Sequence, residues 1–397
     1  MNLNLTFVDC ILLIFCLVSI WFYCYAIYAG IARFGNPTPI DPNFHPSVTI
    51  LKPICGLDRN TYENLASFCQ QVYSEYQIIF AVREAKDPCI QVVHDLIDRF
   101  PNVDIQLVVS DLTIGENLKV SNLANAVGSA KHAILIIADS DIRVEPDYLQ
   151  RVIQPLNDPR IGVVTCPYRS LACGWAATLE AISTATEFQP GVLVSNKLEG
   201  IRFALGSTIA IRKEVLDAIG GFPAIADYLA DDFLLGNLAN RFGYKVVLSD
   251  YVVEHVLANT SLVESIQHQL RWSRCIRVSR PWGYLGLIFT YGTATSLLFW
   301  IATGGSMLGN TVLGITWLSR LTMAWIVGVK CLNDSSTAKY LWLVPLRDLL
   351  SFVVWCCSFF GNTIDWRGRK LKLTKEGKLV PIQAHCAKVA PTYLGSV

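Results

Sequence analysis

Two apolar regions flank a long stretch of mixed polarity, and this division constrains the fold more than any other feature of the chain. Residues 8–31 are apolar apart from Asp9, and about 20 such residues are enough to cross a bilayer. A second apolar zone covers residues 281–361. Charged residues make up only 16% of the chain, against ~25% in soluble domains. The sequence therefore predicts a membrane protein whose central stretch folds outside the lipid.

Basic residues predict the side of the membrane on which this central stretch lies. Arg33 follows the first apolar segment, and four arginines precede the second zone: Arg271, Arg274, Arg277 and Arg280. Lys and Arg concentrate on the cytosolic side of membrane spans. Because the first segment lacks the basic start of a secretory signal, we expect an uncleaved anchor followed by a cytosolic domain.

The second apolar zone contains three candidate spans, at residues 284–303, 311–329 and 340–360. Arg320 lies in the second of these, and Arg347 and Asp348 lie in the third. Charges within a membrane are costly and usually face a protein interior or a cavity. We therefore expect either an Arg–Asp ion pair or a short re-entrant or interfacial helix.

A basic tail follows the second zone, with Arg367, Arg369, Lys370 and Lys372. Such a tail is expected in the cytosol. An anchor that enters from outside and a cytosolic tail require an even number of later spans. One of the three candidates is therefore expected not to cross the membrane fully.

The central stretch alternates strand patterns with helix patterns. Strands are expected at residues 48–51, 76–82, 103–109 and 133–138, and helices at residues 62–71, 88–100 and 118–130. This alternation predicts an α/β fold with a mostly parallel, doubly wound sheet. Ligands of such sheets bind beyond the carboxyl ends of the strands, so polar residues that follow strands are candidates for a site.

Charge and cysteine spacing exclude some classes of protein. The formal net charge is +1, whereas a nucleic-acid-binding domain is clearly basic. The 13 cysteines form no Cys-x-x-Cys pair, and zinc sites and disulfide frameworks need recurring spacings. We expect reduced thiols.

The motif Asp139-Ser140-Asp141 follows the apolar run 133–138. A hard cation such as Mg²⁺ or Mn²⁺ takes a few carboxylate oxygens and completes its shell with phosphates and water. The alternative is an Asp-rich turn, because Asp is common where strands end. The buried strand and the other acidic clusters favour the metal interpretation, with Asp141 and Asp139 as ligands.

A second acidic pair, Asp231-Asp232, precedes a helix pattern at residues 233–241. Acids in a first helical turn are favourable beside the helix dipole, which is the purely structural explanation. The functional one is a general base, because transfer to a hydroxyl needs a carboxylate within hydrogen-bond reach of it. Gly206 and the pair Gly220-Gly221 would let the backbone approach a ligand closely.

A basic and aromatic cluster, His268-Gln269-Leu270-Arg271-Trp272, ends a polar helix that is expected to begin near Ser261. Arg271 offers a planar fork of donors to a diphosphate, and Trp272 can stack on an acceptor or wall it off. The alternative is a belt of Arg and Trp at the membrane surface.

Three further polar residues are candidates for a ligand site. Glu84 and Asp87 come after the strand at residues 76–82, and Lys119 precedes the strand that ends at Asp139. Lys119 suits a phosphate, although an ordinary surface lysine is the alternative. Gly115 is not part of a P-loop, because Gly-Lys-Ser/Thr is missing. The lone histidines, His255 among them, receive no role.

Taken together, residues 48–272 resemble the GT-A nucleotide-sugar glycosyltransferases. More narrowly they resemble the ceramide glucosyltransferase family and its bacterial relatives, the hopanoid-associated glycosyltransferases. The resemblance rests on Leu51-Lys52-Pro53 with Gly56, Asp87-Pro88, residues 119–123, 138–144 and 174–180, Asp231-Asp232-Phe233, residues 268–272 and the tail segment 366–369.

The resemblance implies an inverting transfer of a hexose, glucose or N-acetylglucosamine, from a UDP-sugar to a hydroxyl of a membrane lipid of the ceramide or hopanoid type. It also implies Mn²⁺ or Mg²⁺ as cofactor, a GT-A catalytic domain and no nucleic-acid partner. The oligomeric state stays open.

The resemblance also assigns roles. Asp141 would ligate the metal, with Asp139 beside the metal or the ribose, and Asp232 would be the base next to Asp231. The nucleotide-sugar would contact Glu84, Asp87, Lys119, Asp139, His268, Gln269, Arg271 and Trp272.

The implied organisation has four parts. These are an anchor at residues 1–35, a cytosolic GT-A domain at 36–280, membrane or interfacial helices at 281–361 and a basic cytosolic tail at 362–397. Two departures from the family pattern favour a bacterial branch, and so an inner membrane rather than a Golgi-type one. His268 stands where the family usually has Gln or Arg, and Glu187-Phe188-Gln189-Pro190 stands where animal enzymes have a His-Pro pair.

Two alternatives remain open at this stage. A processive polysaccharide synthase shares these motifs but needs more spans to form a channel. A transporter or scaffold with a degenerate domain is the other, supported by the charges in the apolar zone. Residues 174–191, with Trp175, Leu179, Ile182 and Phe188, are a candidate ramp for a lipid acceptor.

Overall fold

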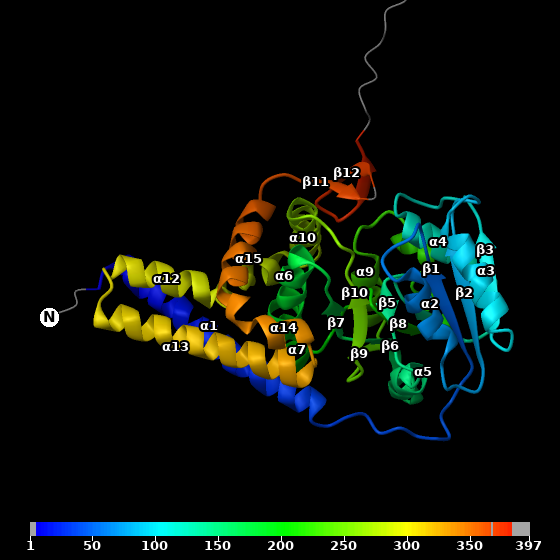
Figure 1. Cartoon of the computed structure of the whole chain (residues 1–397), viewed down its shortest axis with the longest axis horizontal. Coiled ribbons are helices and arrows are strands. Elements are labelled where there is room, and N and C mark those ends of the chain that lie inside the picture. The colour runs from blue at the N-terminus through cyan, green and yellow to red at the C-terminus, as the bar shows by residue number, and fades with distance from the viewer. Residues whose placement is uncertain (1–4, 367, 383–397) are drawn as a thin grey trace, which may run out of the picture.

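A seven-stranded sheet forms the core of the computed structural model, which describes residues 5–366 and 368–382 (Figure 1). Its strand order is β3 (Asp104–Val109), β2 (Tyr76–Val82), β1 (Val48–Pro53), β4 (Ile134–Ile137), β8 (Ile209–Arg212), β6 (Ile161–Thr165) and β9 (Lys245–Leu248). Only β8 runs antiparallel to its neighbours. The predicted α/β fold with a mostly parallel sheet is confirmed.

The predicted helices are present as α2 (Thr61–Cys69), α3 (Cys89–Arg99), α4 (Leu118–Val127) and α9 (Asp231–Arg241). Two short helices that were not predicted, α5 (Tyr148–Val152) and α8 (Lys213–Ala218), accompany them. The β1 strand is buried along its whole length, as expected for a strand covered on both faces of a parallel sheet. Because β1, β2 and β4 are parallel, their carboxyl ends meet at one edge.

A small second sheet extends this edge. It pairs β5 (Ile142–Arg143) with β10 (Val253–Val256) and β10 with β7 (Tyr168–Leu171). Since β5 begins directly after Asp141, this sheet starts where the main sheet ends. The sequence patterns did not predict it.

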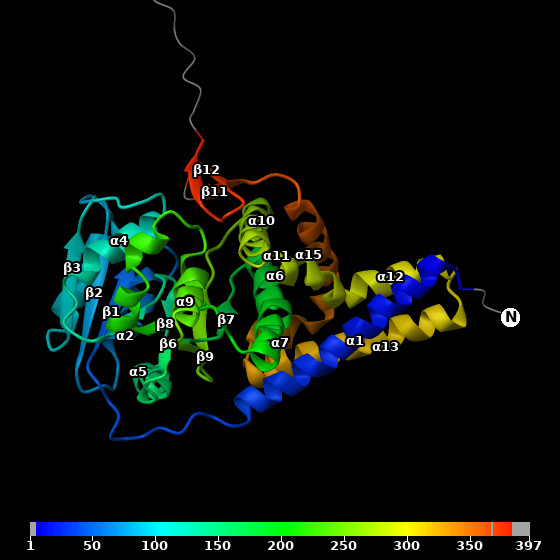
Figure 2. The same cartoon turned by 180° about the vertical axis from the view of Figure 1, so that it is seen from behind.

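Three helical segments lie between the sheets and the apolar helices (Figures 1 and 2). They are α6 (Trp175–Ser183), which continues through a π-helical turn (Thr184–Phe188) into α7 (Gln189–Glu199), and α10 (Leu262–Ser279). Ser261 caps α10 through a capping box with Glu264, so the predicted start is confirmed. The predicted end at Trp272 is wrong, because the helix continues to Ser279.

The apolar helices α1 (Phe7–Phe34), α12 (Gly292–Ala302) and α13 (Met307–Met323) lie side by side and extend away from the sheets (Figure 1). Helix α13 continues in π-helical form to Cys331. Within the described residues, three helices are long and apolar enough to cross a membrane: Phe7–Phe34, Met307–Cys331 and Ser335–Ser358.

The expected span at residues 284–303 is not one straight helix. The segments Pro281–Thr290 and Gly292–Ala302 meet at a bend of 53°, and together they would count as a fourth span. The first of them contains α11 (Pro281–Gly286). Gly286 and Gly292 lie on either side of the break. Because glycine is a poor helix former, they favour an interruption that the apolar composition alone did not predict.

The charges of the apolar zone form an ion pair, one of the two arrangements expected. Arg320 on α13 binds Asp348 on α15 (Val344–Ser358) through contacts of 2.6 and 3.0 Å. Arg347 turns away from its neighbour and donates to the carbonyl of Leu179 at 3.0 Å and to Oε1 of Gln269 at 2.7 Å. Helix α15, preceded by α14 (Ser335–Tyr340), runs across the direction of the α1–α12–α13 bundle (Figure 1).

The segment expected as a basic tail contains a three-stranded antiparallel sheet. Its strands are β11 (Thr363–Trp366), β12 (Arg369–Leu373) and β13 (Leu379–Pro381). Leu229, in the loop before α9, packs among its buried leucines, and the Leu379 N–H donates to the carbonyl of Asp227 at 2.7 Å. Arg367 and residues 383–397 of the expected tail lie outside the described residues.

Candidate active site

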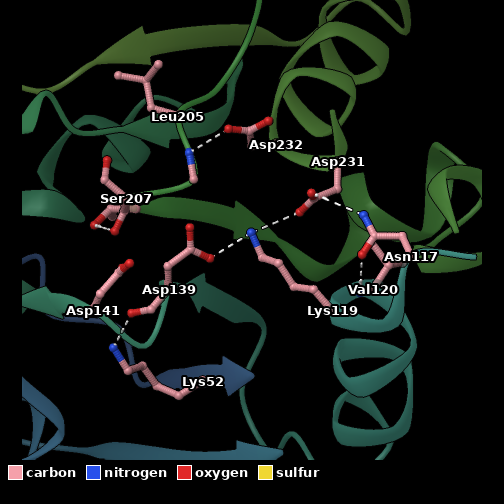
Figure 3. A network of polar contacts seen from close by, with 12 residues as sticks. Lys52, Asn117, Lys119, Val120, Asp139, Asp141, Leu205, Ser207, Asp231 and Asp232 are labelled. Carbon is pink, nitrogen blue, oxygen red and sulfur yellow. Dashed lines mark hydrogen bonds and ion pairs between the residues drawn. The ribbon is translucent and has the colours of Figure 1, made fainter. Parts of the chain in front are cut away.

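Lys119 connects two of the acidic clusters that the sequence singled out (Figure 3). Its Nζ lies 2.7 Å from Oδ1 of Asp139 and 3.0 Å from Oδ2 of Asp231. Asp139 follows β4, Lys119 lies in the first turn of α4 and Asp231 begins α9. Burial alone would lower the pKa of Lys119, but the surrounding carboxylates raise it above its usual range. The lysine is therefore a fixed positive charge between two acids.

Asn117 holds these two segments together. Its Oδ1 accepts from the backbone N–H of Val120 at 3.2 Å and so caps α4. Its Nδ2 donates to the carbonyl of Tyr228 at 2.9 Å and to Oδ1 of Asp231 at 3.3 Å. Because Asn117 is fully buried, the start of α4 is locked to the loop that leads into α9.

Gly206 brings the backbone between two carboxylates, as expected for a close approach. Its N–H donates to Oδ2 of Asp232 at 2.9 Å. A Cβ at this position would lie 2.9 Å from Oδ2 of Asp139 and 3.3 Å from Oδ2 of Asp232. The space next to Gly206 is therefore bounded by the two carboxylates, and a side chain at this position would contact them.

Asp232 has a pKa that is shifted toward neutral pH. Burial and the charge of Asp231 raise the pKa of Asp232 to about 6. Its Oδ1 accepts from the N–H of Phe233 at 2.7 Å, so both of its oxygens are oriented by the backbone. A carboxylate with such a pKa is ionised at pH 7 and is a competent proton acceptor.

Asp141 pairs with His255, to which the sequence gave no role. Oδ2 of Asp141 lies 3.2 Å from Nε2 of His255. Burial would raise the pKa of Asp141, but the charge and hydrogen bond of His255 together with the charge of Lys52 lower it to about 2. The pairing of β10 with β5, which sets His255 opposite Ile142, brings the ring to this position.

Lys52 supports the turn that carries Asp139 and Asp141. Its side chain is fully buried, and its Nζ donates to the backbone carbonyl of Asp139 at 2.7 Å. Burial lowers the pKa of Lys52 to about 7, although both aspartates oppose the shift. The sequence gave this residue no separate role, and its apolar strand offers no signal that a lysine there faces a carbonyl.

Asp139 and Asp141 fit a divalent cation. Their side chains are 35% and 34% exposed, and burial together with the charge of Asp141 raises the pKa of Asp139. A cation would relieve this repulsion between neighbouring carboxylates. No group of three or more His, Cys, Asp or Glu residues suited to a metal occurs among residues 5–366 and 368–382. The rest of the coordination shell would therefore come from phosphate and water.

Asp87 and Glu84 lie apart from this cluster. Asp87 lies in the loop between β2 and α3, and strand β1 separates β2 from β4. Its carboxylate accepts from the N–H groups of Gly56 and Cys89, both at 2.9 Å. Glu84 is exposed, and its carboxylate forms no hydrogen bond with another residue of the described ranges.

The basic and aromatic cluster of α10 contacts α6, the π-helical turn and α15. Nδ1 of His268 lies 3.0 Å from Oε1 of Glu180 on α6, and Gln269 accepts the hydrogen bond from Arg347. The Trp272 ring packs between His268, at 5.4 Å, and Phe188, at 6.2 Å between centroids.

Arg271 connects this helix with the C-terminal sheet. Its guanidinium lies 5.7 Å from the ring centroid of Trp366 on β11. Burial and the nearby charges of Asp232 and Asp231 raise the pKa of the Cys275 thiol, one turn further along α10, whereas the charge of Arg271 lowers it. The middle of α10 therefore lies near the start of α9, whereas Asp87 and Glu84 stay outside the cluster.

Known proteins place this arrangement in a family. A family model, described as "Glycosyl transferase family 21", matches residues 11–379. The chain belongs to glycosyl transferase family 21. The expected membership of a ceramide glucosyltransferase-like family is confirmed by this match and by the relatives below.

Two relatives from Caenorhabditis elegans match over most of the chain. Ceramide glucosyltransferase 1 is 26% identical over 374 residues, which cover 91% of this chain and 78% of the relative. Ceramide glucosyltransferase 3 is 27% identical over 349 residues, which cover 85% of this chain and 74% of the relative.

Among solved structures, a mannosyltransferase from Pyrobaculum calidifontis, in complex with GDP-Man and Mn²⁺, is similar in fold. It superposes with a TM-score of 0.54 at 17% identity, over 88% of this chain and 97% of that one. The likeness supports the GT-A-like arrangement of the mixed α/β domain.

Proposed function

We propose that the protein transfers a hexose from a UDP-sugar to a hydroxyl of a membrane lipid, with ceramide as the first acceptor to test. The observation that carries this proposal is the convergence of Asp139 and Asp231 on Lys119, with Asp141 and Asp232 alongside. Its acceptor class is supported by the ceramide glucosyltransferases of Caenorhabditis elegans, which match most of the chain.

The donor half of the site is proposed around Asp139. Asp139 and Asp141 would hold a divalent cation, Mn²⁺ or Mg²⁺, which would supply positive charge for the departing diphosphate. Lys119 adds a charge that binds phosphate oxygens, and Arg271 offers a second, forked contact. Asp87 follows β2 at the same edge of the sheet, and it is proposed to contact the nucleoside of a donor whose diphosphate reaches Asp139.

Asp232 is the proposed base. It accepts the proton from the acceptor hydroxyl while that oxygen forms a bond to the anomeric carbon of the sugar and the bond from this carbon to the diphosphate oxygen breaks. A single displacement of this kind inverts the anomeric configuration. Asp231, which is held by Lys119 and Asn117, is proposed to position the helix start rather than to accept the proton.

The lipid acceptor is proposed to approach from the side of α6, the π-helical turn and α10. Trp272 and Phe188 give this side an aromatic wall, and Trp175 on α6 is 62% exposed. Residues 174–191 were expected as a ramp for the acceptor, and this segment is helical and continuous with the wall.

The proposed topology sets α1, α13 and the bent pair of segments that ends in α12 in the bilayer, with α15 at its surface. Two spans after the anchor return the chain to the cytosol, which satisfies the requirement for an even number. This arrangement keeps the sheets cytosolic, at a bacterial inner membrane or at a Golgi-type membrane in a eukaryotic cell.

A transfer assay tests the proposal. The purified protein is incubated with a lipid extract, Mn²⁺ and each member of a panel of UDP-sugars, and the lipids are read by mass spectrometry. We expect one lipid class to gain the mass of a single hexose with one preferred donor. Products that carry long sugar chains would instead indicate a polysaccharide synthase, and no transfer with any donor would refute the proposal.

A further inference from the structure

Tyr168, the first residue of β7, is held rigidly beside the acidic cluster. It is 4% exposed, and its ring lies 5.5 Å from that of His255 and 5.8 Å from that of Phe188. The parallel pairing of β7 with β10 sets Tyr168 opposite Val253 and so on the same face as His255. Its backbone carbonyl accepts from the buried Gln189 at 3.0 Å. Both ring and backbone are therefore fixed.

The hydroxyl of Tyr168 has no hydrogen-bond partner among residues 5–366 and 368–382. Three other buried tyrosines behave differently: Tyr23 donates to the carbonyl of Thr290 at 2.8 Å, and Tyr148 and Tyr284 pair with Thr208 and Ser358 at 3.1 and 2.7 Å. Buried polar groups are nearly always paired. Tyr291, which precedes α12 among the apolar helices, also has no partner for its hydroxyl among the described residues, so it is the place of Tyr168 beside the acidic cluster that points to a ligand.

The hydroxyl also opens onto accessible space. It is not among the fully enclosed polar atoms that lack a partner in the described part of the chain. A ligand or a water molecule can therefore reach it.

The charges around this hydroxyl limit what that partner can be. Burial raises the pKa of Tyr168 well above its usual range, and the carboxylates of Asp232, Glu180, Asp141 and Asp139 raise it further. The group is consequently a neutral donor of one hydrogen bond. These carboxylates would repel a phosphate, for which Lys119 is available as a positively charged partner. An uncharged hydroxyl is not repelled by the carboxylates and can accept the hydrogen bond that the tyrosine donates.

We propose that the Tyr168 hydroxyl donates a hydrogen bond to an uncharged hydroxyl oxygen of bound substrate, beside the acidic cluster, and thereby determines which substrate is accepted. This inference rests on the proposed function. A sugar hydroxyl of the donor and a hydroxyl of the lipid acceptor share the required chemistry, and the experiment below distinguishes the two sources.

The variant Tyr168→Phe removes the hydroxyl and keeps the ring contacts. We expect kcat/KM to fall roughly 3- to 10-fold, as for the loss of a hydrogen bond between neutral groups, without a lower melting temperature. If the partner is on the sugar, the wild type will discriminate against a donor that lacks that hydroxyl, and Tyr168→Phe will have lost this discrimination.

If the partner is on the lipid, the same loss of discrimination will be seen with acceptor analogues that lack one non-reacting hydroxyl, while the preference among donors stays unchanged. Kinetic constants are measured with each substrate varied in turn, because a merely structural role would not remove discrimination against one missing hydroxyl.

Tyr76→Phe is the matched control. Its hydroxyl donates to the carbonyl of Cys69 at 3.0 Å, at the amino end of β2 and away from the site, so we expect unchanged kinetics. Wild-type constants and unchanged discrimination in Tyr168→Phe would overturn the inference while transfer by the wild type upholds the proposed function. Absence of transfer by the wild type would overturn both.

Discussion

A cluster of opposite charges at the edge of the sheet and another among the apolar helices differ in exposure. In the sheet cluster, the side chains of Lys119 and Asp139 are 20% and 35% exposed. In the helix cluster, those of Arg320 and Asp348 are 4% and 7% exposed. The first can exchange partners with a ligand, and the second is closed to solvent.

The two clusters also differ in their balance of charge. Arg320 pairs with one carboxylate and donates to the hydroxyl of Thr186 at 3.2 Å, while the hydroxyl of Thr293 donates to Asp348 at 2.6 Å. Nη1 of Arg320 has no hydrogen-bond partner among the described residues. At the sheet edge the carboxylates outnumber the bases around them, so the cluster keeps a demand for positive charge. We infer that the buried Arg320–Asp348 pair stabilises the fold, whereas the partly exposed cluster at the sheet edge is suited to bind a ligand and take part in its chemistry.

The variant Asp232→Asn would sharpen this comparison most strongly. Removal of a general base lowers kcat by about 10²- to 10⁴-fold, and the amide keeps the shape of the side chain. We expect this loss in a lipid-transfer assay, with an unchanged melting temperature. Turnover close to that of the wild type would remove Asp232 as the base.

The variant Arg320→Met is expected to act on stability instead. It leaves Asp348 buried without its partner, which costs about 3–5 kcal/mol for a buried pair. Thermal unfolding in detergent measures the loss. The double variant Arg320→Met with Asp348→Leu should recover much of it, because paired apolar replacements remove the unmatched charge. A single variant as stable as the wild type would contradict a structural role for the pair.

The variant Gly206→Ala tests the space between Asp139 and Asp232. Its Cβ would meet both carboxylates at 2.9 and 3.3 Å, and overpacking of this kind costs about 1–3 kcal/mol. We expect transfer activity to fall roughly 10- to 100-fold. Gly128→Ala is the control, since a Cβ there meets nothing within 4 Å. Equal activity of the two variants would show that the space is not needed.

The pH dependence should be the mildest probe. Burial and the charge of Asp231 raise the pKa of Asp232 to about 6, and only the ionised form accepts a proton. The activity should therefore be maximal at pH values above this pKa and fall as the pH drops through about 6. We expect kcat/KM of the free enzyme to decline about tenfold for each further pH unit. A profile that is flat from pH 7 to 5 would contradict the assignment.

Local sequence patterns predicted the parts of the fold that are local. The apolar strand β4, the acids after it and the cap of α10 each depend on neighbours within a few positions, so periodicity and residue type were sufficient. The position of Glu84 after a strand was a signal of the same kind, but it did not distinguish an exposed acid from one that joins the cluster.

Long-range pairing explains what the sequence patterns could not predict. His255 lies 114 positions from Asp141 and reaches it only through the pairing of β10 with β5. Lys52 was hidden in an apolar strand, and the choice of Arg320 rather than Arg347 as the partner of Asp348 depends on how three helices pack. The strands of the C-terminal sheet are short and rich in basic residues. Their charge pattern alone is the same as that of an extended basic tail, so the sheet was not predicted.

The most direct test of the central claim, that the acidic cluster is one site for a cation and a nucleotide, is calorimetric titration of the purified protein with UDP in the presence and absence of Mn²⁺. The account predicts binding that requires Mn²⁺, that is lost in Asp141→Asn and that persists in Asp232→Asn. Binding that is indifferent to both Mn²⁺ and Asp141, or no binding by the folded wild type, would contradict it.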